Sequence, residues 1–237
     1  MKLLILRPQP GAGKTAARAA ARMLEPVVAP LFTVRPLDWD APDPADVEGV
    51  LLTSANAARH AGEQLGAFIP LPCYAVGDAT AAAAREAGFT DVRVGSSDGQ
   101  RLIRMLASDG IVRALHLCGQ DHIPLDHPQI ALTRRRVYAA DAVAKLPDEA
   151  RRAIERGAVA LIHSARAARL FARLVDEAGL RRDGTAVVAV SEAVAAAAGP
   201  GWRSKAFAPA PRDDALLELA AKLCQNEGER MGQADEC

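Results

Sequence analysis

The chain has 237 residues, which is enough for one large domain or two small ones. Half of the residues are apolar and 24% are charged, as in ordinary globular proteins, so the composition excludes a disordered or fibrous chain. Lys and Arg total 29, as do Asp and Glu, so the chain has no excess of positive charge for a phosphate backbone, and we expect no nucleic-acid partner.

Short apolar runs, each followed by a turn and an alanine-rich segment, recur along the chain. This alternation predicts parallel strands joined by crossover helices. The predicted pairs are strand 3–6 with helix 14–24, strand 49–52 with helix 56–66, strand 73–76 with helix 79–87, strand 159–162 with helix 166–178, and strand 187–190 with helix 192–198. Further strands are predicted at 92–94 and 114–118, and a last helix at 213–224.

Targeting and metal motifs are not found in the sequence. The apolar run at 3–6 is too short for the core of a signal peptide, and no stretch approaches the ~18 apolar residues of a membrane span. The cysteines at 73, 118, 224 and 237 form no CxxC pair and have no close histidine partner. We therefore expect a cytoplasmic protein with reduced thiols, no membrane contact and no metal.

The two halves of the sequence resemble each other. GVLLTSANAARHAGEQL at 49–65 aligns with VALIHSARAARLFARLV at 159–175, which pairs Ser54 with Ser164. Two further blocks follow in the same order, 74–89 with 188–202 and 99–107 with 214–223. Alanine-rich helices also match through composition, but three blocks in one order favour two homologous α/β units. Two such units facing each other would leave a cleft lined by strand carboxyl ends, where we expect a ligand.

Small polar residues follow several predicted strands. Thr53 and Ser54 lie where a strand passes into a helix, and similar turns recur at 76–80, 116–121, 163–166 and 190–193. Such residues cap helices in the absence of any ligand, but free N–H groups at a positive helix end also form an anion site. Several of these turns in one cleft predict a ligand with many carboxylates.

Three other motifs indicate less. GAGKT at 11–15 follows a strand, but Pro8 stands where a Walker loop needs its first glycine, so nucleotide hydrolysis is not expected. The histidines at 60, 116, 122, 127 and 163 lack metal-ligand spacing. The basic run at 134–136 fits either a solvated strand end or a contact with an acidic small molecule.

Segments spread over nearly the whole chain resemble the uroporphyrinogen-III synthase family. These segments, in the family's order, are LRP at 6–8, LLTSANAAR at 51–59, YAVGDATAAAAREAGF at 74–89, HLCGQD at 116–121, RRVYAA at 135–140, LIHSARAARLF at 161–171 and VVAVSEAVAAAA at 187–198. The resemblance implies two Rossmann-like α/β domains with parallel sheets, a two-stranded linker and a cleft between the domains. The first domain would combine 1–33 with 143–237, the inserted domain would be 38–136, and the linkers would be 34–37 and 137–142.

The resemblance also implies a reaction. Hydroxymethylbilane would be cyclised to uroporphyrinogen III with inversion of the last pyrrole ring and loss of water, in the biosynthesis of tetrapyrroles such as haem, sirohaem, cobalamin and chlorophyll. Such a hydro-lyase needs no cofactor and would be a monomer. Its partners would be the substrate, the product and, transiently, the preceding bilane synthase.

Site residues are carried over by motif. Tyr138 in RRVYAA matches the family's tyrosine and is the candidate that assists departure of the hydroxyl; a linker tyrosine with a structural hydrogen bond is the alternative. The candidate substrate-binding residues are Arg7, Thr53, Ser54, Asn56, Gly77, Thr80, Gly119, Ser164 and Ser191. Ser191 and Val194 replace the family's usual glycine and threonine, so the family's hydroxyl contacts do not carry over directly to that turn, where backbone N–H groups could still bind the ligand.

Two other functions are compatible with the sequence. One is a two-lobed binding protein that closes on an acidic small molecule, although such proteins are often exported and no signal peptide is predicted here. The other is an inactive homologue with a regulatory role. Formation of the cyclic type III isomer would separate the enzyme from both.

Overall fold

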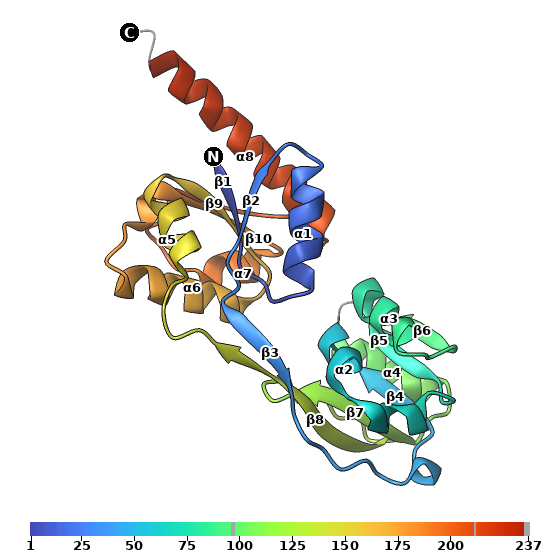
Figure 1. The fold of residues 1–237 in the computed structure, drawn as a ribbon. Coiled ribbons are helices and arrows are strands. Elements are labelled where there is room, and N and C mark those ends of the chain that lie inside the picture. Colours follow the sequence, from blue (N-terminus) through green and yellow to red (C-terminus); the bar gives the residue numbers. More distant parts are fainter. Residues whose placement is uncertain (96–97, 211, 235–237) are drawn as a thin grey trace. The chain divides into compact units, whose positions relative to one another are not determined.

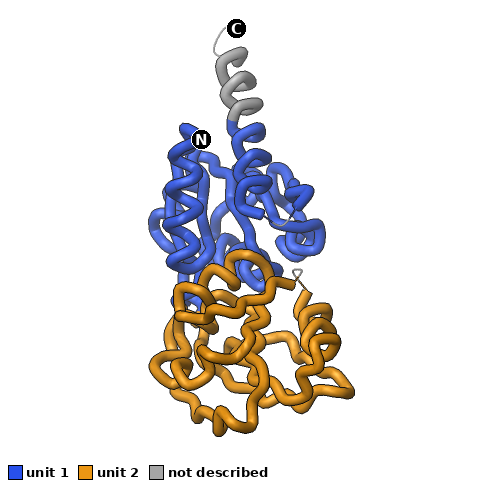
Figure 2. Tube along the Cα trace, turned by 90° about the vertical axis from the view of Figure 1, so that its right-hand side faces the viewer, with its two compact units in different colours: residues 1–33, 142–237 blue, residues 34–141 orange. Residues whose placement is uncertain are grey.

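The computed structural model describes residues 1–95, 98–210 and 212–234. The chain divides into two compact units, blue and orange in Figure 2: unit 1 is Met1–Thr33 with Ala142–Cys237, and unit 2 is Val34–Asp141. Unit 1 is thus built from two separate segments, and unit 2 is one continuous insert between them. The linkers predicted at 34–37 and 137–142 lie in unit 2 apart from Ala142.

Unit 1 contains a five-stranded parallel sheet in the order β11-β10-β9-β1-β2. The strands are β1 (Lys2–Ile5), β2 (Glu25–Val28), β9 (Ala158–Ile162), β10 (Thr185–Ala189) and β11 (Ser204–Phe207). β9 and β10 are buried along their whole length, as expected for parallel strands covered by helices on both faces.

Helices cover the two faces of this sheet separately. Leu3 and Ile5 pack with Ala12 of α1 (Gly11–Ala20) and with Leu216 of α8 (Asp213–Ala234). Figure 1 shows α5 (Asp148–Glu155) and α6 (Ala165–Glu177) on the opposite face. α7 (Glu192–Ala197) contacts α6 and β10, and a short 3-10 helix (Arg182–Gly184) leads into β10.

Unit 2 contains a six-stranded sheet in the order β3-β8-β7-β4-β5-β6. The strands are β3 (Phe32–Pro36), β4 (Gly49–Leu52), β5 (Cys73–Val76), β6 (Val92–Gly95), β7 (Arg113–Gly119) and β8 (Ala131–Ala142). Neighbouring pairs from β8 to β6 are parallel. The neighbouring strands β3 and β8 contain the points where the chain passes from one unit to the other. The predicted α/β class with parallel sheets is confirmed.

The core of unit 2 has two sides. Val50 and Leu52 of β4 pack against α2 (Ala55–His60), a 3-10 helix (Glu63–Phe68) and α3 (Gly77–Glu86). Leu51 and Tyr74 point to the other face and pack against α4 (Gly99–Ser108). A short 3-10 helix (Pro44–Asp46) precedes β4.

Some predicted elements differ from the structure. The helix predicted at 56–66 is wrong as one element, because α2 ends at His60 and Gly62 adopts a φ of +68° before the 3-10 helix begins. Helix α1 starts at Gly11 rather than at residue 14. The prediction did not name β2, α4, α5 or β11, and it included β3 and β8 only through the linkers at 34–37 and 137–142. β11 escaped it because SKAF is an edge strand whose side chains alternate in burial, with no apolar run.

The internal repeat corresponds to the strand order. The aligned blocks match β4 with β9, β5 with β10, and α4 with α8. With these matches, the order β6-β5-β4-β7-β8 in unit 2 becomes β11-β10-β9-β1-β2, which is the order in unit 1. β7 and β8 therefore correspond to β1 and β2, although the latter stand first in the chain. The two units are circular permutations of one arrangement.

Candidate functional site

The strand order of unit 2 places a topological switch point between β4 and β7. From β4 the chain continues to β5 and β6 on one side, and then crosses to β7 and β8 on the other. A crevice forms outside the carboxyl ends of the strands at such a point, because the connections leave in opposite directions. Thr53 follows β4 and Gly119 ends β7, so both residues lie at this crevice.

A cavity of about 430 Å³ lies at this position. Its wall consists of Thr53 and Ser54, residues 98–100 at the start of α4, the loop 121–125 and Tyr138 of β8, with Val76 and Gly119. Its volume is in the range of small-molecule pockets. The site is therefore a cavity at the strand ends, lined by both polar and apolar residues and built wholly from unit 2.

Capping residues shape this wall. The Ser54 hydroxyl accepts from the Asn56 N–H (3.2 Å) at the start of α2, and the Asp98 carboxylate accepts from the Gln100 N–H (2.9 Å) at the start of α4. Asp98 also lies 3.8 Å from Arg101, which offsets part of its negative charge. Gly77 begins α3 outside this wall with a φ of +70°, a conformation that favours glycine. The caps use the N–H groups of Asn56 and Gln100, so the proton of the Ser54 hydroxyl remains as a donor at the wall.

Tyr138 and Gly119 share one space. A Cβ on Gly119 would lie 2.7 Å from Cζ and 2.9 Å from the hydroxyl of Tyr138, so any side chain there would displace the ring. The Gln120 N–H donates to the Tyr138 carbonyl at 2.8 Å and ties the end of β7 to β8. Glycine at 119 therefore allows the phenol to lie across the carboxyl end of β7, at the wall of the cavity.

A buried histidine lies beneath the cavity. His116 of β7 is fully buried, and its Nε2 lies 3.2 Å from the Thr53 hydroxyl. Burial, assisted by the charge of Arg134, lowers the pKa of His116 to about 3, so the ring is neutral at pH 7. The His122 ring lies edge-on to it, with centroids 6.2 Å apart. The neutral imidazole of His116 therefore lies within hydrogen-bond distance of the Thr53 hydroxyl, which lines the cavity.

Comparisons with known proteins agree on one family. The family model described as "Uroporphyrinogen-III synthase HemD" matches residues 13–218, which is most of the chain. The chain belongs to the uroporphyrinogen-III synthase family. The resemblance stated from the sequence is confirmed, and with it a place among enzymes of porphyrin and tetrapyrrole biosynthesis. No curated protein matches the chain.

Solved structures of uroporphyrinogen-III synthases share the fold. The synthetase from Helicobacter pylori is 14% identical with a TM-score of 0.61, and the match covers 94% of this chain and 98% of that one. A mutant synthase from the extremely thermophilic bacterium Thermus thermophilus is 14% identical with a TM-score of 0.52, and the match covers 95% of this chain and 99% of that one. At 14% sequence identity, these two matches show that the proteins share a fold.

The structure of this synthase-family chain separates the candidate residues into three groups. Thr53, Ser54, Gly119 and Tyr138 line the cavity of unit 2. Asn56, Gly77 and Thr80 belong to α2 and α3 in the same unit but not to the cavity wall, and Thr80 is buried in α3. Arg7, Ser164 and Ser191 belong to unit 1.

In unit 1, Arg7 belongs to a partly buried polar cluster. Its Nη1 donates to both oxygens of Asp213, at 2.9 and 3.1 Å, and Thr15 donates to the same carboxylate at 2.7 Å. His163 Nε2 lies 3.1 Å from it. Burial alone would raise the pKa of Asp213, but hydrogen bonds from His163 and Thr15 and the charge of Arg7 hold it well below its usual range. Asp213 is ionised at the first residue of α8.

Ser164 and Ser191 are helix caps in the same unit. The Ser164 hydroxyl accepts from the Ala167 N–H at 3.1 Å and the Ser191 hydroxyl from the Val194 N–H at 3.4 Å. Both hydroxyls therefore have a local structural role at the carboxyl ends of β9 and β10. They retain their own protons for other contacts.

Sequence reasoning assigned no role to several residues of these polar groups, among them Thr15, His116 and Asp213. His116 interrupts the apolar run RALHLCG, and a single polar residue within a buried strand was the available signal. Asp213 gave no such signal, because its partners lie about 50 to 200 residues away in sequence.

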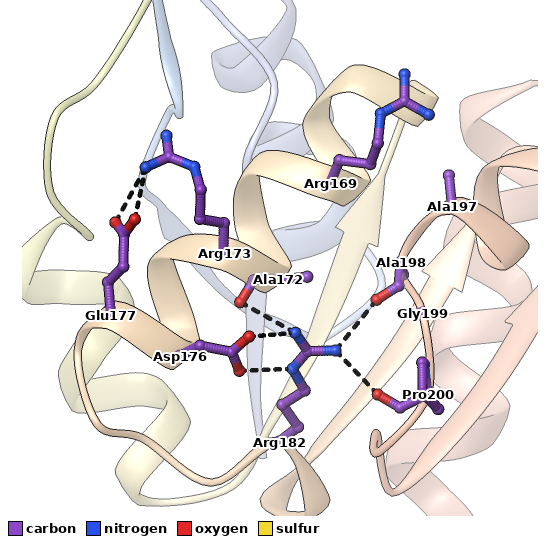
Figure 3. A pocket seen from close by; sticks show the side chains of 10 residues that line it. All are labelled: Arg169, Ala172, Arg173, Asp176, Glu177, Arg182, Ala197, Ala198, Gly199 and Pro200. Atoms are coloured by element: carbon purple, nitrogen blue, oxygen red, sulfur yellow. Dashed lines mark hydrogen bonds and ion pairs between the residues drawn. The ribbon is translucent and has the colours of Figure 1, made fainter.

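A second hollow on unit 1, between α6 and α7, is occupied by a structural arginine. Figure 3 shows Arg182 donating to Asp176 and to the carbonyls of Ala172, Ala198 and Pro200. Its guanidinium also lies 5.2 Å from the centroid of the Trp202 ring. These contacts use its donors within the protein, so Arg182 joins α6 to the end of α7 rather than offering an anion site.

The part of the chain whose side chains are described shows no metal-ligand group. Among residues 1–95, 98–210 and 212–224, no three His, Cys, Asp or Glu side chains are grouped so as to hold a metal ion. His122 Nδ1 lies 3.0 Å from the Gly119 carbonyl, and His127 Nδ1 accepts from the Gln129 N–H. In the same described ranges, every helix is too short or too polar to cross a bilayer.

Proposed function

We propose that this chain is a uroporphyrinogen-III synthase that cyclises hydroxymethylbilane to uroporphyrinogen III, inverting the last pyrrole ring and releasing water. The observation that carries the proposal is the pocket at the β4–β7 switch point, where a phenol and hydroxyl donors line one wall. Family membership supplies the reaction class.

The proposed chemistry places modest demands on the protein. The hydroxyl of the bilane must leave as water, which breaks a C–O bond, takes up a proton and leaves an azafulvene cation. The substituted carbon of the terminal ring attacks this cation to give a spiro intermediate. The bond from the spiro carbon to the old neighbouring bridge then breaks and re-forms at the free carbon of the same ring, which loses a proton. The enzyme's main task is to hold the chain so that the inverted ring closes, which is catalysis by orientation. No cofactor takes part.

Roles are proposed for the candidate residues. Tyr138 assists departure of the hydroxyl as a proton donor. Thr53 and Ser54 bind substrate carboxylates through their hydroxyl protons, and Arg7, Ser164 and Ser191 are also proposed as substrate-binding residues. Since each of these serines accepts a backbone N–H, its own proton is available to an acceptor on the ligand.

A coupled assay tests the proposal. Hydroxymethylbilane synthase supplies the bilane continuously, and the products are oxidised and separated into type I and type III isomers. A synthase gives mainly type III, at a rate proportional to the amount of this chain. Ligand-dependent stabilisation with only the spontaneous type I isomer would instead indicate a two-lobed binding protein or an inactive homologue.

A further inference from the structure

A row of polar side chains crosses the unit 2 sheet beneath the cavity. His116 of β7 is the register partner of Leu51 in β4 and of Arg134 in β8. Side chains two residues apart on a strand point to the same face, so Thr53 shares the face of Leu51. His116 therefore lies between Thr53 on one side and Arg134 on the other, on the face that α4 covers.

Some hydrogen bonds in this row are formed, and two of its buried nitrogen atoms have no partner among the described residues. His116 Nε2 meets the Thr53 hydroxyl at 3.2 Å, and Arg134 Nη2 donates to the Leu125 carbonyl at 2.9 Å, on the cavity loop. Among the described residues, His116 Nδ1 and Arg134 Nε are buried without a hydrogen-bond partner. The two unpartnered atoms belong to register neighbours.

This environment selects one form of the imidazole. A neutral histidine carries a single N–H, on either Nδ1 or Nε2. A proton on Nδ1 would be a buried donor without an acceptor, next to a guanidinium that has only donors and a positive charge. Buried donors without partners are rarer in proteins than under-satisfied acceptors. The proton therefore belongs on Nε2, which faces Thr53.

We propose that His116 is a positioning residue that donates from Nε2 to the Thr53 hydroxyl and so directs the Thr53 proton to a carboxylate of the ligand. A threonine hydroxyl has one proton, and when its oxygen accepts from His116 that proton is free for the cavity. The positive charge of Arg134 disfavours a proton on His116 Nδ1, and its Nη2 donates to the Leu125 carbonyl on the cavity loop. The carboxylate follows from the proposed bilane substrate, so this inference rests on the proposed function.

Nitrogen NMR of the unmodified chain tests the tautomer without any assay. In protein labelled with ¹⁵N-histidine, two-bond correlations identify which ring nitrogen carries the proton. We expect His116 at pH 7 as the Nε2–H form. A proton on Nδ1, or an imidazolium, would overturn the inference, and the measurement needs no variant that has to fold.

Variants test the consequence for the substrate. Thr53→Val should raise KM for the bilane about tenfold with kcat within about twofold, the effect of losing one hydrogen bond to a charged group. His116→Leu should raise KM about three- to tenfold, and the double variant should match Thr53→Val alone. Thr53→Ser should restore most of the affinity. Thr185→Val, which removes a buried hydroxyl in β10 of unit 1, is the matched control and should leave KM unchanged.

Two results would contradict the positioning role. Additive effects on KM in the double variant would show that His116 does not act through Thr53. An unchanged KM in Thr53→Val would show that Thr53 does not bind a carboxylate of the substrate. Equilibrium binding of uroporphyrin, a stable polycarboxylate, tests the positioning role of His116 separately from the proposed synthase function. If wild-type protein produces no type III isomer but binds uroporphyrin in a Thr53-dependent way, the synthase proposal fails and this inference stands.

Discussion

At the scale of single residues, Tyr138 is the group whose chemistry can be isolated most cleanly. Tyr138→Phe keeps the ring over Gly119 and deletes only the hydroxyl. If that hydroxyl assists loss of water, turnover should fall by ~10 to 10⁴-fold, nearer the lower end because the bilane also closes by itself. The type I isomer should rise as type III falls. The isomer ratio at an unchanged melting temperature is the measurement, and a wild-type ratio would exclude Tyr138 from the mechanism.

We predict that the phenol of Tyr138 keeps its position only with glycine at residue 119. In Gly119→Ala the new Cβ would lie 2.7 Å from Tyr138 Cζ, so the ring has to move. We expect turnover to drop at least as much as in Tyr138→Phe, with a loss of stability of roughly 1–3 kcal/mol from overpacking. Gly66→Ala is the control, because nothing lies within 4 Å of a Cβ there. Equal rates in Gly119→Ala and wild type would contradict the prediction.

His116 gives the protein a predictable response to acid. Its pKa falls from 6.5 to about 3 on burial, so below pH 6.5 the unfolded chain binds a proton that the folded chain excludes. Stability therefore falls as the pH drops through that window, by up to about 1.4 kcal/mol per pH unit. The difference in unfolding free energy between wild type and His116→Leu, measured by denaturant titration from pH 7 to pH 4, should follow this slope. A difference independent of pH would refute it.

At the scale of elements, Asp213 anchors the first turn of α8. Its partners come from the end of β1, from α1 and from the end of β9, through Arg7, Thr15 and His163. Asp213→Asn removes the charge while keeping the shape, and should lower stability by about 2 kcal/mol because the site is largely buried.

The neighbouring residue provides the comparison. Asp214 also pairs with an arginine, Arg22, but its side chain is 60% exposed. Asp214→Asn should cost below about 1 kcal/mol, as exposed ion pairs do. Chemical denaturation of the two variants measures the difference, and equal losses would show that the Asp213 cluster is not a tertiary anchor.

At the scale of the whole molecule, unit 2 is an insert in the sequence of unit 1, and we expect unit 1 to fold without it. The Val143 N–H donates to the Leu31 carbonyl at 3.0 Å, so the two chain segments of unit 1 run together where the insert leaves it. Joining Thr33 to Ala142 through a short glycine-rich link should give a folded protein, and residues 34–141 should fold alone because their core is their own. Cooperative thermal unfolding of each piece checks this; a piece without a transition contradicts it.

What the sequence determined by itself was the local and repeated part of this protein. Strands 49–52 and 73–76 were predicted with their bounds, because continuous apolar runs between turn residues depend on local pattern alone. The repeat and the family motifs indicated two α/β units, and Tyr138 and Gly119 were named from motifs in separate segments. Their contact could not be predicted, because it depends on the register of β7 against β8.

Only the tertiary structure decided how distant segments combine. The circular permutation of the two units appears in the strand order and not in the order of the aligned blocks. The Thr53–His116–Arg134 row comes from three strands whose pairing brings together residues 18 to 81 positions apart. The polar residue within RALHLCG marks His116 in the sequence but not the side chains that it meets. Those neighbours are decided by which strands pair and in which register, and this depends on burial across the whole sheet rather than on adjacent residues.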